Sequence, residues 1–381
     1  MAGEQGFDPG RRAWLARGAT AAVAAPLATL LPLASGSAVA KAPSPKASNG
    51  PIRLDLNESS YGPSPKVAAA IAQALPLAPR YVSVEQGDAL AAQIAALEGV
   101  APEQVIIGEV LEPLGQHLAL AGGGGSFVYS VPGYDALVKA AAPFGGKAIE
   151  VPLDAGLYND LPALLAAIQP DTRALFVVNP HNPSGTISPA AAFDAFVEAA
   201  SARTLVIVDE AYLDYQPDAA ARSAVRHLHQ GRNVAVFRTL GKIHALAGLQ
   251  VGYALVPRDL ADALRTRGVG GSHGFNQLSI AAASASLADP AYIAGVRERV
   301  ARERTTWLAL LRERGWRYAE PAGNFLFINT ARPHAEVAAG LLAHGIRIGR
   351  SFAPYDNWVR ITIGTQAENV QARAALVAVL A

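Results

Sequence analysis

Four short stretches of this chain carry side chains that could do chemistry together: residues 179–186 (NPHNPSGT), 208–212 (VDEAY), 238–242 (RTLGK) and 247–253 (AGLQVGY). They supply an amide at Asn182, a carboxylate at Asp209, a phenol at Tyr212 and an amine at Lys242. Such a set could bind a polar ligand and move protons on it, provided that the fold brings the stretches to one place.

Asp209 is the acid with the most informative position, because it follows the apolar run 205–208. Open α/β sheets bind ligands at the carboxyl ends of their strands, and a buried aspartate is costly unless it meets a cation. A helix N-cap is the alternative interpretation of Asp209. The prolines and glycine around Asn182 can fix a turn without any function. Lys242 could be a solvated charge, but its small neighbours at 245–248 favour a turn near the sheet edge.

In this order and spacing the stretches resemble the fold-type I pyridoxal-phosphate aminotransferases, and among them the histidinol-phosphate aminotransferase branch. The resemblance runs from about residue 52 to the C-terminus. It implies pyridoxal 5'-phosphate as cofactor, held as a Schiff base by Lys242, the catalytic residue. It implies that Asp209 keeps the pyridine nitrogen protonated, which makes the ring an electron sink, and that Asn182 and Tyr212 bind the ring oxygen. The implied reaction moves an amino group from a small amine or amino-acid donor to a 2-oxo acid acceptor.

The same resemblance implies further contacts. Tyr134 would lie against the cofactor ring, since aromatic faces stack favourably, although a core tyrosine is an equally good interpretation. Tyr81 stands where a family tyrosine reaches the cofactor phosphate of the neighbouring subunit, which implies a homodimer. Arg360 would bind a substrate carboxylate or phosphate, for which a planar guanidinium is suited. A surface tyrosine and an exposed strand arginine are the alternatives. The stretch 54–65 resembles the family's substrate-side arm and adds two substrate-binding candidates, Asn57 and Tyr61.

The resemblance is weakest where the family binds the cofactor phosphate. A hydroxyl-bearing turn that leads into a helix is replaced here by residues 108–115 (GEVLEPLG), which makes Glu109 and Val110 the cofactor-binding positions. Gly241 and Gln250 stand where the family has a serine and an arginine. Thr239, backbone amides and a partner's Tyr81 remain to hold the phosphate. A hydrogen bond to a charged group contributes about 1.5–3 kcal/mol, so we expect weaker cofactor binding than in relatives.

Strands and helices alternate from residue 52 onward, which predicts an α/β fold. Apolar runs typical of strands buried on both faces of a parallel sheet occur at 105–107, 127–129, 174–178, 205–208 and 234–237. Helical spacing is found at 67–75, 88–97, 191–199, 292–314 and 335–344. Crossover connections then imply a mainly parallel sheet. With the resemblance, the predicted fold class is a three-layer αβα large domain with a mainly parallel sheet plus a small α+β C-terminal domain.

The first forty residues have the pattern of an export signal. Arg11 and Arg12 precede the uncharged run 18–34, and residues 38–40 (AVA) offer a cleavage site. Paired arginines resemble the twin-arginine type, whose translocase would deliver the mature protein to the periplasm without a membrane attachment. An uncleaved anchor is the alternative, which the prolines and weakly hydrophobic alanines disfavour. We expect a signal at 1–40, a linker and N-terminal arm at 41–75, a large cofactor-binding domain at 76–265 and a small domain at 266–381.

Composition excludes several classes of function. The chain has 32 basic and 31 acidic side chains, and the first forty residues hold three of the former and two of the latter. The remainder is neutral, so nothing in its charge predicts nucleic acid as a partner. The absence of cysteine excludes disulfides and thiolate metal sites, and no metal is expected. Two alternatives stay open: another reaction at Lys242, such as decarboxylation or racemisation, and a non-catalytic binding protein that keeps the fold.

Overall fold

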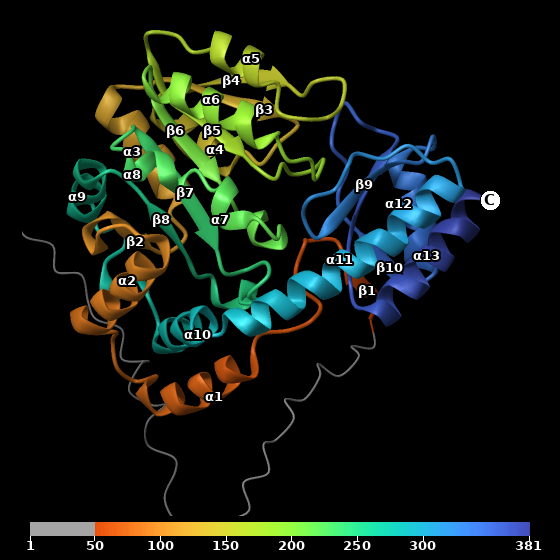
Figure 1. The fold of residues 1–381 in the computed structure, drawn as a ribbon, viewed down its shortest axis with the longest axis horizontal. Coiled ribbons are helices and arrows are strands. Elements are labelled where there is room, and N and C mark those ends of the chain that lie inside the picture. Colours follow the sequence, from red (N-terminus) through yellow and green to blue (C-terminus); the bar gives the residue numbers. More distant parts are fainter. Residues whose placement is uncertain (1–49) are drawn as a thin grey trace, which may run out of the picture. The chain divides into compact units, whose positions relative to one another are not determined.

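The structure is a computed structural model that describes residues 50–381. The predicted export signal and the linker up to residue 49 lie outside the described residues. In the described part, a sheet of seven strands has the order β2-β8-β7-β6-β5-β3-β4 (Figure 1). Its strands are β2 (Val105–Ile107), β3 (Gly125–Val131), β4 (Gly146–Pro152), β5 (Thr172–Val178), β6 (Leu205–Asp209), β7 (Val234–Thr239) and β8 (Gly252–Leu255).

Only β8 runs against its neighbours in this sheet, since it pairs with β2 and β7 in antiparallel register and the other pairs are parallel. Each of the five strands expected from apolar runs lies within an observed strand. The prediction of a mainly parallel sheet is therefore confirmed.

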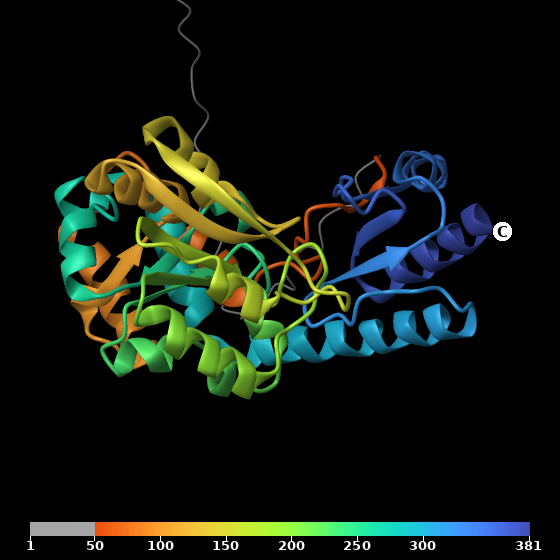
Figure 2. The ribbon, with the colours of Figure 1, turned by 90° about the horizontal axis from the view of Figure 1, so that it is seen from above.

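Helices cover both faces of this sheet, because its strands are apolar on both sides (Figure 2). Phe127 and Phe176 face a layer made by α3 (Leu111–Gly122), α4 (Ala136–Ala141) and α9 (Arg258–Thr266). Val128 and Val177 face the opposite layer. That layer comprises α1 (Pro65–Ala74), α2 (Val84–Glu98), α5 (Leu161–Ala166), α6 (Ala190–Ser201), α8 (Val225–His229) and α10 (Gln277–Leu287). The αβα layering that was predicted is thus confirmed.

A separate apolar cluster, away from the two faces of the large sheet, is built mainly from the C-terminal part of the chain. Here β9 (Phe325–Asn329) pairs with β11 (Trp358–Thr362), and β1 (Ile52–Leu54) pairs with β10 (Ile346–Ile348). The helices α11 (Pro290–Glu313), α12 (His334–Ala343) and α13 (Gln366–Leu380) pack on these strands. Because β1 joins β10, the N-terminal segment is fixed to the C-terminal part. The boundaries at residues 75 and 265 stay predictions.

The short helix α7 (Ala219–Arg222) completes the α-helices of the described chain. No helix between residues 50 and 381 has both the length and the apolarity needed to cross a membrane. Over the same residues there is no group of His, Asp or Glu side chains that could hold a metal ion.

Candidate active site

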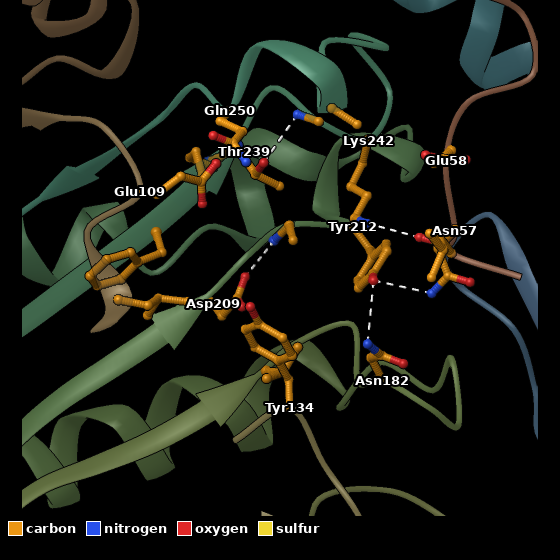
Figure 3. A pocket seen from close by; sticks show the side chains of 18 of the residues that line it. Asn57, Glu58, Glu109, Tyr134, Asn182, Asp209, Tyr212, Thr239, Lys242 and Gln250 are labelled. Atoms are coloured by element: carbon orange, nitrogen blue, oxygen red, sulfur yellow. Dashed lines mark hydrogen bonds between the residues drawn. The ribbon is translucent and has the colours of Figure 1, made fainter. Parts of the chain in front are cut away.

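Five loops at the carboxyl edge of the large sheet line one cavity of about 780 Å³. They follow β2, β3, β5, β6 and β7, and they contribute Glu109, Tyr134, Asn182, Asp209 and Lys242 (Figure 3). Parallel strands end at the same edge of a sheet, which explains how residues so distant in sequence meet.

Asp209 is the last residue of β6 and is only 6% exposed. Its Oδ1 atom accepts a hydrogen bond of 2.9 Å from the backbone N–H of Ala211. Burial raises the pKa of Asp209 to about 6, although the Ala211 bond and the charge of Lys242 act in the opposite direction. One hydrogen bond and one nearby cation do not offset the cost of burying this carboxylate, so the site is suited to a cationic group of a ligand.

The hydroxyl of Tyr212 accepts two hydrogen bonds from amides. Asn57 Nδ2 lies 3.1 Å from this oxygen and Asn182 Nδ2 lies 3.4 Å from it (Figure 3). Since both amides donate, the hydroxyl proton of Tyr212 remains available for an acceptor in the cavity.

Lys242 lies in the turn after β7, and its Nζ atom donates to the carbonyl of Leu56 at 3.1 Å. The same atom lies 5.8 Å from the centre of the Tyr212 ring. None of the ion pairs in the described chain involves Lys242. Its amine is therefore held by one carbonyl and is accessible to a ligand in the cavity.

Arg360 projects from β11 into the cavity and is 7% exposed, unlike the exposed strand arginine considered as an alternative. Nη1 donates to Asn182 Oδ1 at 2.6 Å and Nη2 donates to the carbonyl of Asp55 at 2.7 Å. Nε has no hydrogen-bond partner in the described structure. A Cβ atom on Gly349 would come within 3.1 Å of Nε, so glycine leaves room for the guanidinium. Burial lowers the pKa of Arg360, yet a guanidinium stays charged at neutral pH.

The remaining predicted cofactor residues also line the cavity. Thr239 accepts a hydrogen bond of 3.0 Å from the N–H of Gly241, and Val110 immediately precedes α3. Tyr134 is 44% exposed, and burial of its hydroxyl together with nearby acids raises the pKa of Tyr134 to about 12. Gln250 lines the cavity with a φ angle of 48°.

Two predicted residues lie elsewhere in the described chain. The ring of Tyr61 lies 4.9 Å from the guanidinium of Arg299, away from the cavity lining. Tyr81 is 82% exposed, and its ring centre lies 5.4 Å from that of His273. Asn57 does line the cavity, with its amide directed at Tyr212. The substrate roles of Asn57 and Tyr61 and the cofactor role of Tyr81 stay predictions.

Sequence reasoning missed several residues of the site. The carbonyl of Leu56 had no signal in the sequence, because any residue could supply it. Arg350 and Phe352 also line the cavity, with the guanidinium 4.2 Å from the ring centre. The guanidinium of Arg238, another lining residue, pairs with the carboxylate of Glu210 at 2.9 Å. Arg238 and Glu210 stand in the stretches 238–242 and 208–212, so the pairing of these buried charges could have been expected from the sequence.

Comparison with known proteins agrees with this geometry. The family pattern described as "Aminotransferase class I and II" matches residues 49–376. The chain belongs to the class I and II aminotransferases. This aminotransferase is 36% identical over 326 residues to the histidinol-phosphate aminotransferase of Moorella thermoacetica. The aligned region covers 84% of this chain and 82% of that protein. It is also 36% identical over 325 residues to an aromatic amino acid aminotransferase of Rhodococcus jostii, covering 84% and 88% of the two chains.

Among solved structures, this aminotransferase is similar to histidinol-phosphate aminotransferase from Sinorhizobium meliloti in complex with pyridoxal-5'-phosphate. The TM-score is 0.77 at 30% identity, over 87% of this chain and 91% of the other. The resemblance seen in the sequence is therefore confirmed: the protein is a pyridoxal-phosphate-dependent transaminase of fold type I.

The cavity of this aminotransferase fits the ring of pyridoxal phosphate. The buried Asp209 suits a protonated ring nitrogen, the Tyr212 proton suits a ring oxygen, and Lys242 supplies the amine. Where the cofactor phosphate would lie, the hydroxyl of Thr239 and the backbone amides at the start of α3 can donate hydrogen bonds. The N-cap of α3 makes no side-chain hydrogen bond, so those amides are free of a competing cap.

Proposed function

We propose that this aminotransferase accepts donors that carry an anionic group beside the amine, and that Arg360 binds this group. The observation that carries the proposal is the buried guanidinium with an unpartnered Nε atom in the cavity that Lys242 enters. Aromatic side chains of Tyr134 and Phe352 in the same lining suit a donor with a planar side chain. Donors named for the relatives, histidinol phosphate and aromatic amino acids, share both features.

The residues of the site have separable tasks in the reaction. Pyridoxal phosphate, when bound, supplies an aldehyde that links to amines and a ring that accepts electrons. Asp209 holds a positive charge at the ring nitrogen, and Tyr212 donates its proton to the ring oxygen. Lys242 can hold or release a proton next to the donor's Cα, while Arg360 orients the donor through its anionic group.

The experiment that tests donor binding compares an amino acid with the amine formed from it by decarboxylation. Arg360→Lys should lower kcat/KM for the amino acid about tenfold to a hundredfold, because a charge-assisted contact contributes about 1.5–3 kcal/mol. The amine should lose much less, which controls for damage to Asn182 and the cofactor. Equal losses for both donors would show that Arg360 does not bind the anionic group.

We also propose that the protein is exported through the twin-arginine route and acts in the periplasm. Arg11, Arg12 and residues 38–40 support this proposal. Periplasmic protein should begin at Lys41, and replacing both arginines by lysine should leave the precursor in the cytoplasm. An uncleaved N-terminus on cytoplasmic protein would contradict export.

A further inference from the structure

The cavity has a distinct region where the cofactor phosphate must lie. On the pyridine ring, the phosphate arm is attached on the side of the aldehyde carbon opposite to the ring oxygen. With the ring oxygen at Tyr212 and the aldehyde carbon at Lys242, the phosphate is directed away from Asn57 and Asn182. Figure 3 shows Glu109, Thr239 and Gln250 together on that side of the cavity. With their lining neighbours, the residues there are Gly108, Glu109, Val110, Thr239, Gly241 and Gln250. We call these six residues the phosphate cup.

The phosphate cup contains an acid and no basic side chain. Glu109 follows β2, and its side chain is exposed to the cavity. Thr239 can donate its hydroxyl proton, because its oxygen already accepts from the N–H of Gly241. The uncapped amides at the start of α3 attract an anion. A phosphate bound there would therefore meet neutral donors and one carboxylate.

The basic side chains elsewhere in the cavity lining are engaged by other groups. Lys139 pairs with an aspartate at 2.9 Å, and Arg238 pairs with a glutamate at 2.9 Å. Arg360 bonds to Asn182 and to a backbone carbonyl. Arg350 lies over the ring of Phe352. Lys242 is needed for the aldehyde carbon, and the free Nε atom of Arg360 is the group that we assign to the donor. None of these five residues belongs to the phosphate cup.

Four charged or titratable groups interact electrostatically with Glu109: Lys242, Glu112, Asp209 and Tyr134. Burial and Glu112 raise the pKa of Glu109, whereas the charge of Lys242 lowers it. Glu109 in turn raises the pKa of Asp209 and of Tyr134. Lys242 is the one cation among these groups, and its amine would link to the cofactor aldehyde, so it is not available to the phosphate.

We propose that Glu109 and the cofactor phosphate share one proton, so that this aminotransferase holds its cofactor more weakly as the pH rises. Two neighbouring anionic groups of the same sign disfavour double ionisation, and the pair titrates as a unit. A phosphate monoester loses its second proton near pH 6 in water, so an adjacent carboxylate keeps that proton bound to higher pH. Above neutrality, binding of the doubly charged phosphate takes up one proton from solvent, which balances the charge.

The first test uses the full enzyme and pyridoxal phosphate. Calorimetric titration of cofactor-free protein at pH 8 uses buffers of different ionisation enthalpy. The parent should take up about one more proton per cofactor than Glu109→Gln, because proton changes at Lys242 and at the ring nitrogen are common to both proteins. In the bound parent, the phosphate pKa read from the ³¹P NMR signal should lie well above its value in water. A doubly charged phosphate at pH 7, with equal proton uptake by the parent and Glu109→Gln, would overturn the proposal and would point to a cation from a partner subunit.

The second test compares Glu109→Gln with Glu112→Gln. Both changes remove one acid at the start of α3, but Glu112 lies outside the cavity lining. At pH 8 Glu109→Gln should tighten cofactor binding at least about tenfold, the effect of one pKa unit, and should take up about one proton fewer than the parent. Glu112→Gln should change affinity much less. Pyridoxal, which lacks the phosphate, should bind equally to the parent and to both variants.

Equal effects of the two substitutions on pyridoxal phosphate would overturn the proposal. If Glu109→Gln fails to fold, the ³¹P titration of the phosphate in the parent still decides it. The proposal rests on the cofactor but not on the donor preference, since neither test requires turnover. A failure of the Arg360 experiment would therefore leave the assignment of Glu109 unaffected.

Discussion

The burial of Asp209 has opposite effects on the cofactor-free and cofactor-bound protein. Without the cofactor, burial raises the pKa of Asp209 to about 6, compared with 3.8 for an ordinary aspartate. The native state then binds the proton more tightly than the unfolded state, so the contribution of Asp209 to stability falls as the pH rises from about 4 to above 6. Two pKa units correspond to about 3 kcal/mol. A ring nitrogen that carries a proton reverses this loss.

We predict that cofactor-free Asp209→Asn protein is more stable than the parent at pH 8, by up to about 3 kcal/mol. The difference should shrink toward pH 4, where the parent carboxyl is protonated in the native state and about half protonated in the unfolded state. Urea unfolding at pH 4, 6 and 8 measures it, with the exposed Asp262→Asn as the control. The same Asp209 variant should retain less cofactor on dialysis. A variant no more stable than the parent at pH 8 would show that Asp209 is neutral or already compensated.

At the scale of elements, the segment between β1 and α1 connects the two parts of the site. Asn57 is 1% exposed; its N–H donates to Thr362 Oγ1 in β11 at 3.0 Å, and its amide reaches Tyr212 on the large sheet. Its φ angle of 55° lies in the left-handed region, which asparagine tolerates better than other non-glycine residues. One residue thus sets both the path of the segment and the position of the Tyr212 hydroxyl.

Comparing Asn57→Gly with Asn57→Ala separates these two roles. Both remove the amide, but alanine adds the strain of a positive φ, so we expect it to be less stable by about 1 kcal/mol. Both should shift the cofactor absorbance, because Tyr212 loses a donor. Gly231→Ala calibrates the strain alone, since φ there is +73° and an added Cβ has no neighbour within 4 Å. Equal unfolding free energies for the two Asn57 variants would mean that the segment relaxes.

At the scale of the whole molecule, the chain from the end of α1 to the first residue of α2 exposes apolar side chains that suit a second copy. Leu75 is 58% exposed, Leu77 44%, Tyr81 82% and Val84 60%. Burial of a leucine side chain contributes about 1.5–3 kcal/mol, so such a row can stabilise association. The homodimer expected from the family resemblance stays a prediction, and this surface is where we place it.

We predict that Leu75→Glu combined with Leu77→Glu weakens dimerisation at least about tenfold, which corresponds to about 1.4 kcal/mol. Sedimentation velocity across a concentration series measures the change. Cofactor retention should fall in parallel, because a partner's Tyr81 would no longer reach the phosphate. Val370→Glu, at another exposed apolar residue on α13, is the control. A parent that sediments as a monomer would refute the dimer.

The sequence by itself determined five strands of the large sheet, five of the helices and the family, whereas β4, β8 and helices such as α3 and α13 were not predicted from it. Apolar runs such as 174–178 and 205–208 report burial on both faces locally, and the motifs around Asn182, Asp209 and Lys242 keep their spacing along the chain. It also showed where the phosphate cup departs from relatives. These features depend on short-range patterns, so they need no knowledge of what packs against them.

The tertiary structure alone decided how the site is completed. Lys242 contacts the carbonyl of Leu56 across 186 residues, and Arg360 contacts Asn182 across 178. These partners are chosen by the pairing of β1 with β10 and of β11 with β9, which places the N-terminal segment and the C-terminal strands beside the large sheet. A backbone carbonyl carries no sequence signal, and the direction of an arginine depends on the space that a distant glycine leaves. Packing, rather than local pattern, therefore fixed these contacts.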